Sequence, residues 1–140
     1  MSKKKAVIFD LDNTLADIKD EEAHHKKRHE SFAKEAENAP EIKKNVKKLH
    51  KEQKKNDIVI LTARSAHYEP ETKDWLKKHD INPDRLVMRP ADDTKDSDKK
   101  VKKKLLKKDV SRQFNVKKAY DDKEKNIKMF EKQGIKGKKV

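Results

Sequence analysis

The chain has 140 residues, which is enough for one domain with its own hydrophobic core and too few for two. Charged residues make up 46% of the sequence, cysteine is absent, and no apolar run approaches the roughly 18 residues that cross a membrane. Disulfides, thiolate metal sites and membrane spans are therefore excluded. The formal net charge of +13 favours a polyanionic partner, although the many lysines equally suit a solvated surface. The start M-S-K-K-K leaves no room for a signal peptide, so we expect a single cytoplasmic domain over residues 1–140.

The first predicted element is a short strand over residues 6–9. Its four apolar residues are flanked by charge, which is typical of a buried parallel strand. Asp10 and Asp12 follow at its carboxyl end, where ligands of open α/β sheets bind. Strand side chains alternate, so the two carboxylates point the same way if the chain stays extended. The alternative is that these acids only form a turn or cap a helix.

A highly charged segment follows, and we expect a helix over residues 16–38. His24, His25 and His29 lie in it. No carboxylate stands at a recognised metal-ligand spacing from them, so we interpret them as a solvated helix face. The alternative is that Arg28 and His29 lie over the mouth of the site.

The next two elements repeat the order of helix and strand. Residues 41–55 have apolar side chains at helical spacing and predict an amphipathic helix. Residues 57–64, D-I-V-I-L-T-A-R, form a second apolar strand that ends in polar groups, so Thr62 and Arg64 should reach the same sheet edge as the two acids. A hydroxyl and a planar guanidinium suit a bound phosphate. A third helix, residues 71–79, comes after a loop.

The second half continues with a short strand, residues 86–88, a polar loop and a helix that begins near Asp98. Asp98 and Lys102 are four residues apart, so they share a helix face and can pair. Lys102 also stands in a lysine-rich run, where a solvated role is the alternative. A strand over residues 116–120 and a last helix complete the chain.

The alternation of strands and helices predicts a three-layer α/β/α, Rossmann-like domain with a mainly parallel sheet. The last strand ends in Asp121 and Asp122, so four carboxylates should meet near Asp10 and Asp12. Such a cluster is costly unless a cation lies within it, and a hard divalent ion with oxygen ligands, Mg²⁺, meets this need.

These groups indicate phosphoryl transfer through an aspartyl-phosphate. Asp10 would attack phosphorus in line. Asp12 would protonate the leaving oxygen and then deprotonate the hydrolytic water. We expect Asp12 to be protonated when substrate binds, because nearby negative charge favours the neutral acid.

Four segments carry a resemblance to a known family: D-L-D-N-T at residues 10–14, L-T-A-R at 61–64, a lysine near a helix start, and Y-D-D at 120–122. In order and spacing they resemble the four motifs of haloacid dehalogenase (HAD) superfamily phosphatases, over essentially the whole chain. V-M-R-P-A-D-D-T, the segment over residues 98–106 and A-Y-D-D-K-E-K-N-I-K-M-F further resemble the 3′-phosphatase domain of phage polynucleotide kinase-phosphatases.

The resemblance implies catalytic and metal-binding roles for four acids. Asp10 would be the nucleophile and Asp12 the general acid and base, with the Asp12 backbone carbonyl also on Mg²⁺. Asp121 and Asp122 would complete the metal site, to which the side chain of Asp10 also contributes.

It also implies roles in phosphate and substrate binding. Thr62 would bind the phosphoryl group, and Arg64 would contact phosphate or the substrate strand. Lys102 would neutralise charge and be held in place by Asp98. Lys100 is the alternative lysine if the alignment slips by two residues.

Departures from the family pattern modify these expectations. Asn13 stands where glycine is common, and no P-loop kinase motif is present, so we expect no 5′-kinase activity. The chain after the last predicted helix is short, which predicts a domain without the further strand that is usual in relatives. No insertion is large enough for a cap domain, so the site should be open.

An open site and a basic surface fit a nucleic-acid end better than a sequestered metabolite. We therefore predict a Mg²⁺-dependent phosphatase that removes terminal 3′-phosphates from DNA or RNA. The alternatives are a HAD phosphatase for mononucleotides or other small phosphoesters, and an inactive protein that binds nucleic-acid ends.

Overall fold

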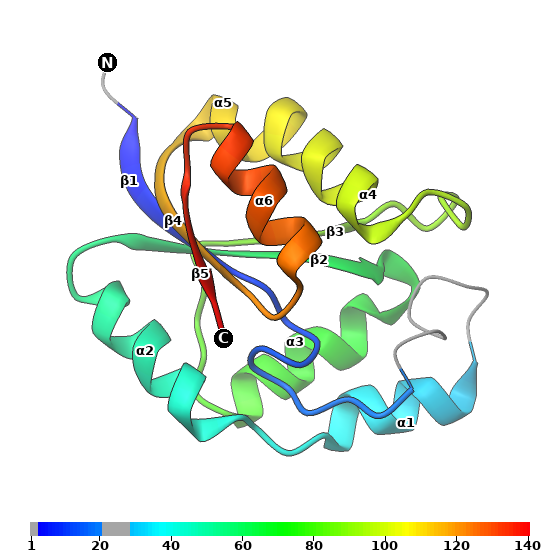
Figure 1. Cartoon of the computed structure of the whole chain (residues 1–140). Helices are drawn as coiled ribbons and strands as arrows, with labels where there is room; N and C mark the ends of the chain where they lie inside the picture. The colour runs from blue at the N-terminus through cyan, green and yellow to red at the C-terminus, as the bar shows by residue number, and fades with distance from the viewer. Residues whose placement is uncertain (1–2, 21–28) are drawn as a thin grey trace.

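A computed structural model describes residues 3–20 and 29–140, in which a five-stranded parallel sheet lies between two layers of helices (Figure 1). The strand order is β3-β2-β1-β4-β5, so the first strand is central. The strands are β1 (Lys4–Phe9), β2 (Asp57–Ser65), β3 (Arg85–Arg89), β4 (Phe114–Asp121) and β5 (Lys136–Lys139). This arrangement confirms the predicted three-layer α/β/α class, and no large cap domain is inserted among the described residues.

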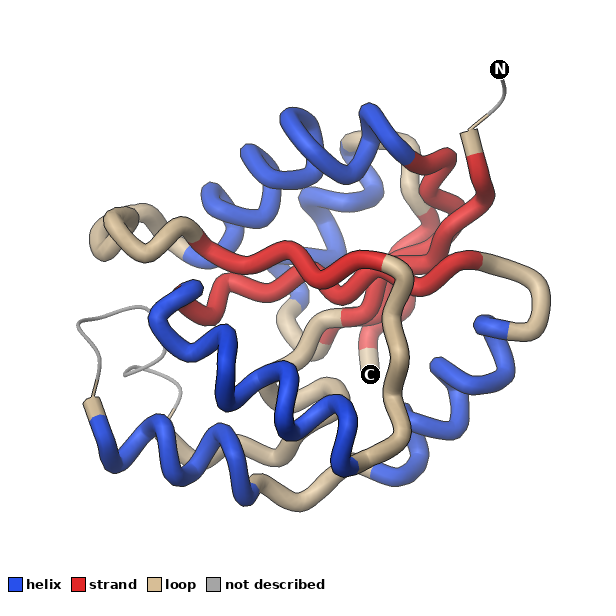
Figure 2. The backbone as a smooth tube through the Cα atoms, turned by 180° about the vertical axis from the view of Figure 1, so that it is seen from behind, coloured by secondary structure: helices blue, strands red, loops and turns tan. Residues whose placement is uncertain are grey.

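Two hydrophobic cores form because successive side chains of β1 face opposite layers. Val7 and Phe9 pack toward α1 (Glu30–Asn38), α2 (Lys43–Gln53) and α3 (Glu69–Lys78). Ala6 and Ile8 pack toward α4 (Asp98–Leu105), the π-helical turn that follows it (Leu106–Val110) and α6 (Glu124–Lys132). A short α5 (Ser111–Gln113) leads into β4. Figure 2 shows the same layers from behind. No described helix is long and apolar enough to span a membrane.

The helix predicted over residues 16–38 is wrong in its first part, because the structure is irregular over residues 16–20 and α1 begins only at Glu30. Asn13 adopts a left-handed φ of 63°, which asparagine tolerates better than most residues, and its Oδ1 accepts a hydrogen bond of 2.9 Å from the Ile18 amide. The Ile42 amide donates to the carbonyl of Leu15 at 2.7 Å. Hydrogen bonds with Asn13 and Ile42 therefore replace helical hydrogen bonds in this segment. His24, His25 and Arg28 lie outside the described residues.

The expectation that the chain lacks a further strand is also wrong. β5 pairs in parallel with β4, and Gly137 lies opposite Ala119. A Cβ on Gly137 would stand 2.6 Å from Cγ2 of Ile127 and 3.3 Å from its carbonyl oxygen. The sequence signal is weak because the segment K-G-K-K is short and has almost no apolar residues.

Replacing Gly137 with Ala should therefore lower the free energy of unfolding by about 1–3 kcal/mol, since the added methyl group forces α6 away from β5. Chemical denaturation of the variant would measure this loss. Lys139→Ala, in the same strand but exposed, is the matched control and should change stability by about 0.5 kcal/mol or less. Equal stability of the two variants would show that α6 and β5 are not closely packed at this point.

Candidate active site

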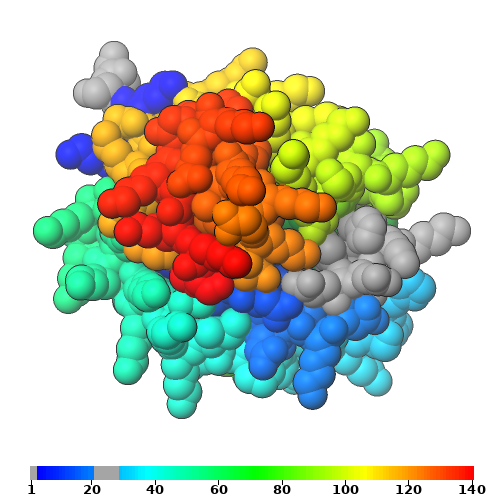
Figure 3. All heavy atoms as spheres, viewed as in Figure 1, coloured from blue at the N-terminus to red at the C-terminus, as the bar shows by residue number. Residues whose placement is uncertain are grey.

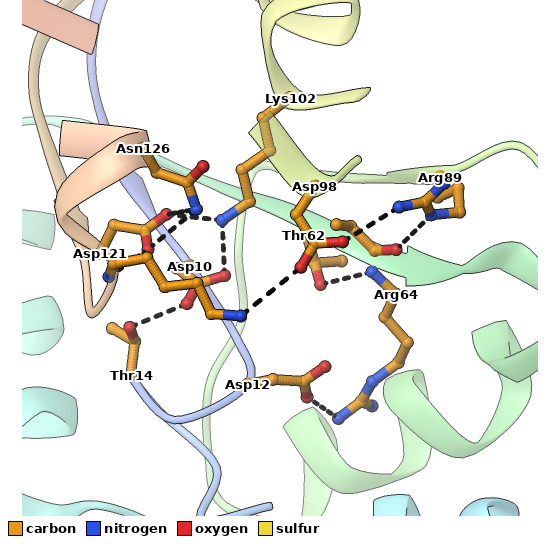
Figure 4. Close-up of polar contacts among 12 residues, drawn as sticks. Asp10, Asp12, Thr14, Thr62, Arg64, Arg89, Asp98, Lys102, Asp121 and Asn126 are labelled. Atoms are coloured by element: carbon orange, nitrogen blue, oxygen red, sulfur yellow. Dashed lines mark hydrogen bonds and ion pairs between the residues drawn. The ribbon is translucent and has the colours of Figure 1, made fainter. Parts of the chain in front are cut away.

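A small cavity opens at the carboxyl ends of β1, β2 and β4, between the N-terminal ends of α4 and α6 (Figure 4). Parallel strands bring their polar terminal residues to one edge of the sheet, where ligands of such sheets bind. Seven of the lining residues were singled out by the sequence, Asp10, Asp12, Thr62, Arg64, Asp98, Lys102 and Asp122, and Ala63, Lys123 and Asn126 complete the lining.

Lys102 joins two of the strand ends. Its Nζ donates to Oδ1 of Asp10 at 2.7 Å and to Oδ2 of Asp121 at 2.5 Å, and its side chain is only 2% exposed. Burial opposes the charge of this ammonium, but the carboxylates of Asp10 and Asp121 outweigh burial and raise the pKa of Lys102. Lys100, the alternative from the sequence, is 61% exposed and pairs with Asp96 at 3.5 Å. The structure therefore places Lys102 and not Lys100 at the site.

Asp10 is held from both its backbone and its side chain. Its amide donates to the carbonyl of Tyr120 at 2.9 Å, and its Oδ2 accepts a hydrogen bond of 3.0 Å from the Thr14 hydroxyl. Burial, followed by the charge of Asp121, raises the pKa of Asp10 well above its usual value, although Lys102 acts in the opposite direction. The carboxylate thus lies in a place that favours a further positive charge. Sequence reasoning missed Thr14, which only its position within the D-L-D-N-T motif could have suggested.

Three carboxylates converge in a way that suits a metal ion. Oxygen atoms of Asp10, Asp121 and Asp122 all lie within 4.8 Å of one another. The Asn126 amide donates to both oxygens of Asp121 at 3.2 Å, and the Lys123 amide donates to Asp121 Oδ1 at 3.0 Å. An all-oxygen set of ligands with one ammonium among three acids fits a hard divalent cation such as Mg²⁺. Asn126 was missed by sequence reasoning, because the role of an isolated asparagine in a helix shows only in the fold.

Arg64 contacts Asp12 directly and does not reach into open space. Its Nη2 pairs with Oδ1 of Asp12, its Nη1 donates to the Thr72 hydroxyl at 2.8 Å, and its guanidinium lies 5.5 Å from the ring centroid of Phe32. Thr62 Oγ1 accepts the Arg64 amide at 3.0 Å, which shapes the end of β2. Asp12 thus lines the same cavity as Asp10 and Asp122, and the buried guanidinium of Arg64 also faces it.

The expected pairing of Asp98 with Lys102 is also wrong, since both hydrogen bonds of Lys102 go elsewhere. Asp98 Oδ1 accepts from Nη2 of Arg89 at 3.0 Å, and its Oδ2 lies 3.8 Å from Nζ of Lys123. Arg89 is fully buried at the end of β3, and its Nε donates to the carbonyl of Ala63 at 2.7 Å. It fixes the loop that leads into α4. In the sequence, Arg89 stands directly after a predicted strand, but the residue pattern alone did not distinguish it from an arginine on the surface.

The cavity combines an aspartate after the first strand, a second acid two residues later, a buried lysine from a helix and an acidic pair at the end of a later parallel strand. This is the arrangement that the sequence analysis expected of a HAD phosphatase. A family model described as the polynucleotide kinase PNKP phosphatase domain matches residues 4–140. The chain therefore belongs to the PNKP phosphatase-domain family.

Two solved structures have the same fold over 99% of this chain, each with a TM-score of 0.85. They are entitled "Structure of the Pnkp1/Rnl/Hen1 RNA repair complex", at 24% sequence identity, and "Structure of Pnkp1/Rnl/Hen1 complex", at 25%. The chain spans only 42% and 46% of the matched chains, so it corresponds to less than half of each. No curated protein sequence matches the chain.

Proposed function

We propose that this domain is a Mg²⁺-dependent phosphatase that hydrolyses terminal 3′-phosphates of nucleic acid. The observation that carries the proposal is the buried ammonium of Lys102, which lies 2.7 Å from Asp10 Oδ1. Attack of a carboxylate on a phosphate brings two anions together, and a fixed cation beside the nucleophile offsets their repulsion.

In the first step, a carboxylate oxygen of Asp10 forms a bond to phosphorus while the bond from phosphorus to the 3′ oxygen breaks. Asp12 gives its proton to that oxygen, which leaves as a hydroxyl. Lys102 and Thr62 stabilise charge on the transferred group. Asp12 then takes a proton from water, which attacks the phosphorus of the aspartyl-phosphate, releases inorganic phosphate and restores Asp10.

The pairing of Asp12 with Arg64 gives the arginine a place in this scheme. Its guanidinium lies beside the carboxyl that acts on the leaving oxygen, and its planar set of N–H groups suits the oxygens of a phosphate. Arg64 would therefore serve substrate binding. When Mg²⁺ is bound, Asp10, Asp121, Asp122 and the backbone carbonyl of Asp12 would hold it, and it would supply further neutralisation of phosphoryl charge.

Three observations support nucleic acid as the substrate. The family is named for polynucleotide kinase, and the titles of both structural neighbours name Pnkp1, one of them as part of an RNA repair complex. The chain carries a net charge of +13, which favours a polyanion. The site also has no large cap among the described residues, so a polymer end has access to it.

The proposal is tested by measuring phosphate release with Mg²⁺ from four substrates at two salt concentrations. These are 3′-phosphorylated RNA, 3′-phosphorylated DNA, a 5′-phosphorylated oligonucleotide and a 3′-mononucleotide. We expect release from a 3′-phosphorylated strand, weakened by salt, and none from the 5′ end. Equal or faster, salt-independent turnover of the mononucleotide would favour a phosphatase of small phosphoesters. Tight binding without release would favour an inactive end-binding protein.

Mg²⁺ itself should stabilise the fold, because it binds the native cluster of acids and not the unfolded chain. A concentration 100 times the dissociation constant adds about 2.7 kcal/mol, which raises Tm by roughly 5–10 °C in a domain of this size. Asp122→Asn should remove most of this rise in a thermal melt. Asp92→Asn, an exposed aspartate in the loop before α4, is the control and should keep it. An equal rise in both variants would place the ion elsewhere.

A further inference from the structure

A groove runs between α4 and α6 and begins beside the active site. The two helices pack against each other, and Figure 3 shows the orange atoms of α6 next to the yellow-green atoms of α4. Five lysines line this lysine groove together with Met129 and Gln133: Lys99 and Lys103 from α4, and Lys125, Lys128 and Lys132 from α6. Lys99 follows Asp98, and Lys125 precedes Asn126, so the groove starts one residue away from the lining of the active site.

The lysine groove has unbalanced positive charge. No acid lines it, all five lysines are exposed, and within the described chain none of them pairs with a carboxylate. The two acids of α6 face the other way: Glu124 lies 3.8 Å from Lys139 of β5, and Glu131 packs at Gly137 of the same strand. Acids are thus kept on the β5 side of α6, while its groove side carries cations only.

The lysines form two rows that lead away from the active site. In each helix a pair of lysines is four residues apart, which corresponds to about 6 Å along the helix axis. Lys99 and Lys103 form such a pair on α4, and Lys128 and Lys132 form one on α6, with Lys125 nearer the site. Two parallel rows of ammonium groups suit a linear polyanion whose end lies in the catalytic cavity.

A second lysine-lined groove lies between α2 and the β4–β5 edge, and it is less suitable. Its lining includes Glu52, whose carboxylate accepts from Lys118 at 2.8 Å and from the Tyr120 hydroxyl at 2.7 Å. It also lies on the α2 side of the sheet, away from the face covered by α4 and α6. The groove between α4 and α6 has neither disadvantage.

We propose that the lysine groove binds the backbone phosphates of the single strand whose 3′ end occupies the active site. The inference rests on the proposed function for the position of that end, while phosphate binding in the groove follows from its charge. The contacts involve the backbone and not the bases, so they are independent of sequence and weaken with salt.

The test compares two double variants with equal changes of charge. Lys128→Gln with Lys132→Gln removes one pair in the groove, and Lys43→Gln with Lys47→Gln removes an exposed pair of the same spacing on α2, across the sheet. Fluorescence anisotropy with a labelled single-stranded 15-mer measures affinity at several salt concentrations. Phosphate release is measured from the 3′-phosphorylated 15-mer and from a 3′-phosphorylated dinucleotide, which is too short to reach Lys128 and Lys132.

For the groove variant, we expect the KM of the 15-mer to rise about tenfold at 0.1 M salt and the salt slope of binding to fall by about 1.4, or 0.7 for each lost contact. Its kcat and its KM for the dinucleotide should stay unchanged, and the α2 variant should behave like the unmodified protein. Equal losses in both variants would overturn the proposal. Poly-glutamate that competes for the protein as strongly as an oligonucleotide of the same total charge would also overturn it. If no substrate releases phosphate, the proposed function fails, and the binding measurements still decide the role of the groove.

Discussion

Asp10→Asn is expected to abolish phosphate release while leaving the protein folded. An amide is not a nucleophile toward phosphorus, so the loss in kcat should be on the order of 10⁴-fold or more. Because burial and the charge of Asp121 disfavour a charged Asp10, the neutral side chain should not lower Tm in metal-free buffer. Single-turnover assays with a 3′-phosphorylated oligonucleotide, together with a thermal melt, would measure both effects.

Asp92→Asn is the matched control, since it makes the same chemical change at an exposed position outside the cavity. It should keep full activity. Trapping of a labelled phosphoryl group on the unmodified protein, and its absence from Asp10→Asn, would identify the acylphosphate directly. Activity above about a tenth in Asp10→Asn would assign the nucleophile to another group.

Lys102→Met is expected to cause the largest loss of stability. The methionine matches much of the volume of lysine but leaves the carboxylates of Asp10 and Asp121 buried without their shared cation. Removing one partner of such a buried network costs about 3–5 kcal/mol, which corresponds to a fall in Tm of roughly 6–20 °C. Phosphate release should also fall by about 10²- to 10³-fold, because a fixed charge beside the transferred group is lost.

Lys100→Met removes an exposed lysine two residues away and should change the free energy of unfolding by about 0.5 kcal/mol or less. Mg²⁺ should restore part of the stability of Lys102→Met, because it brings a positive charge back to the same acids. Urea denaturation of both variants, with and without Mg²⁺, would measure this difference. Similar stabilities of the two variants without metal would show that Lys102 is not essential to the charge balance of the site.

The strands β1, β2 and β3 were predictable because each contains a short apolar run bounded by charge or polar residues, and a buried sheet is the stable place for such a run. The polar residues at the strand ends, Asp10, Thr62 and Asp121, follow from the same pattern, since parallel strands share one carboxyl edge. β5 was missed because its residues are mostly lysine and glycine, and its pairing depends on the exposed edge of β4.

Helix limits were less predictable where distant contacts compete with local propensity. Residues 16–20 are charged enough to suggest a helix, yet Ile18 and Ala16 are buried and bind the chain near Asn13 and Glu41. The residue pattern of one segment does not show which residues outside that segment it will contact. The start of α4 at Asp98 was predictable because a polar loop gives way there to apolar residues at helical spacing.

The class of the fold, the order of most of its elements and the acids at the strand ends were predictable from the sequence, because hydrophobic spacing and strand ends are local properties of the chain. The sequence left the site lysine open between Lys102 and Lys100. Which charges meet became clear only from the contacts in the folded chain. The fold places Lys102 between Asp10 and Asp121, Arg64 on Asp12 and Arg89 on Asp98. In a chain with 39 lysines and arginines, each acid has many cations available in the sequence. Burial and packing select one of them, since an ion pair inside the protein requires both groups to be held at contact distance.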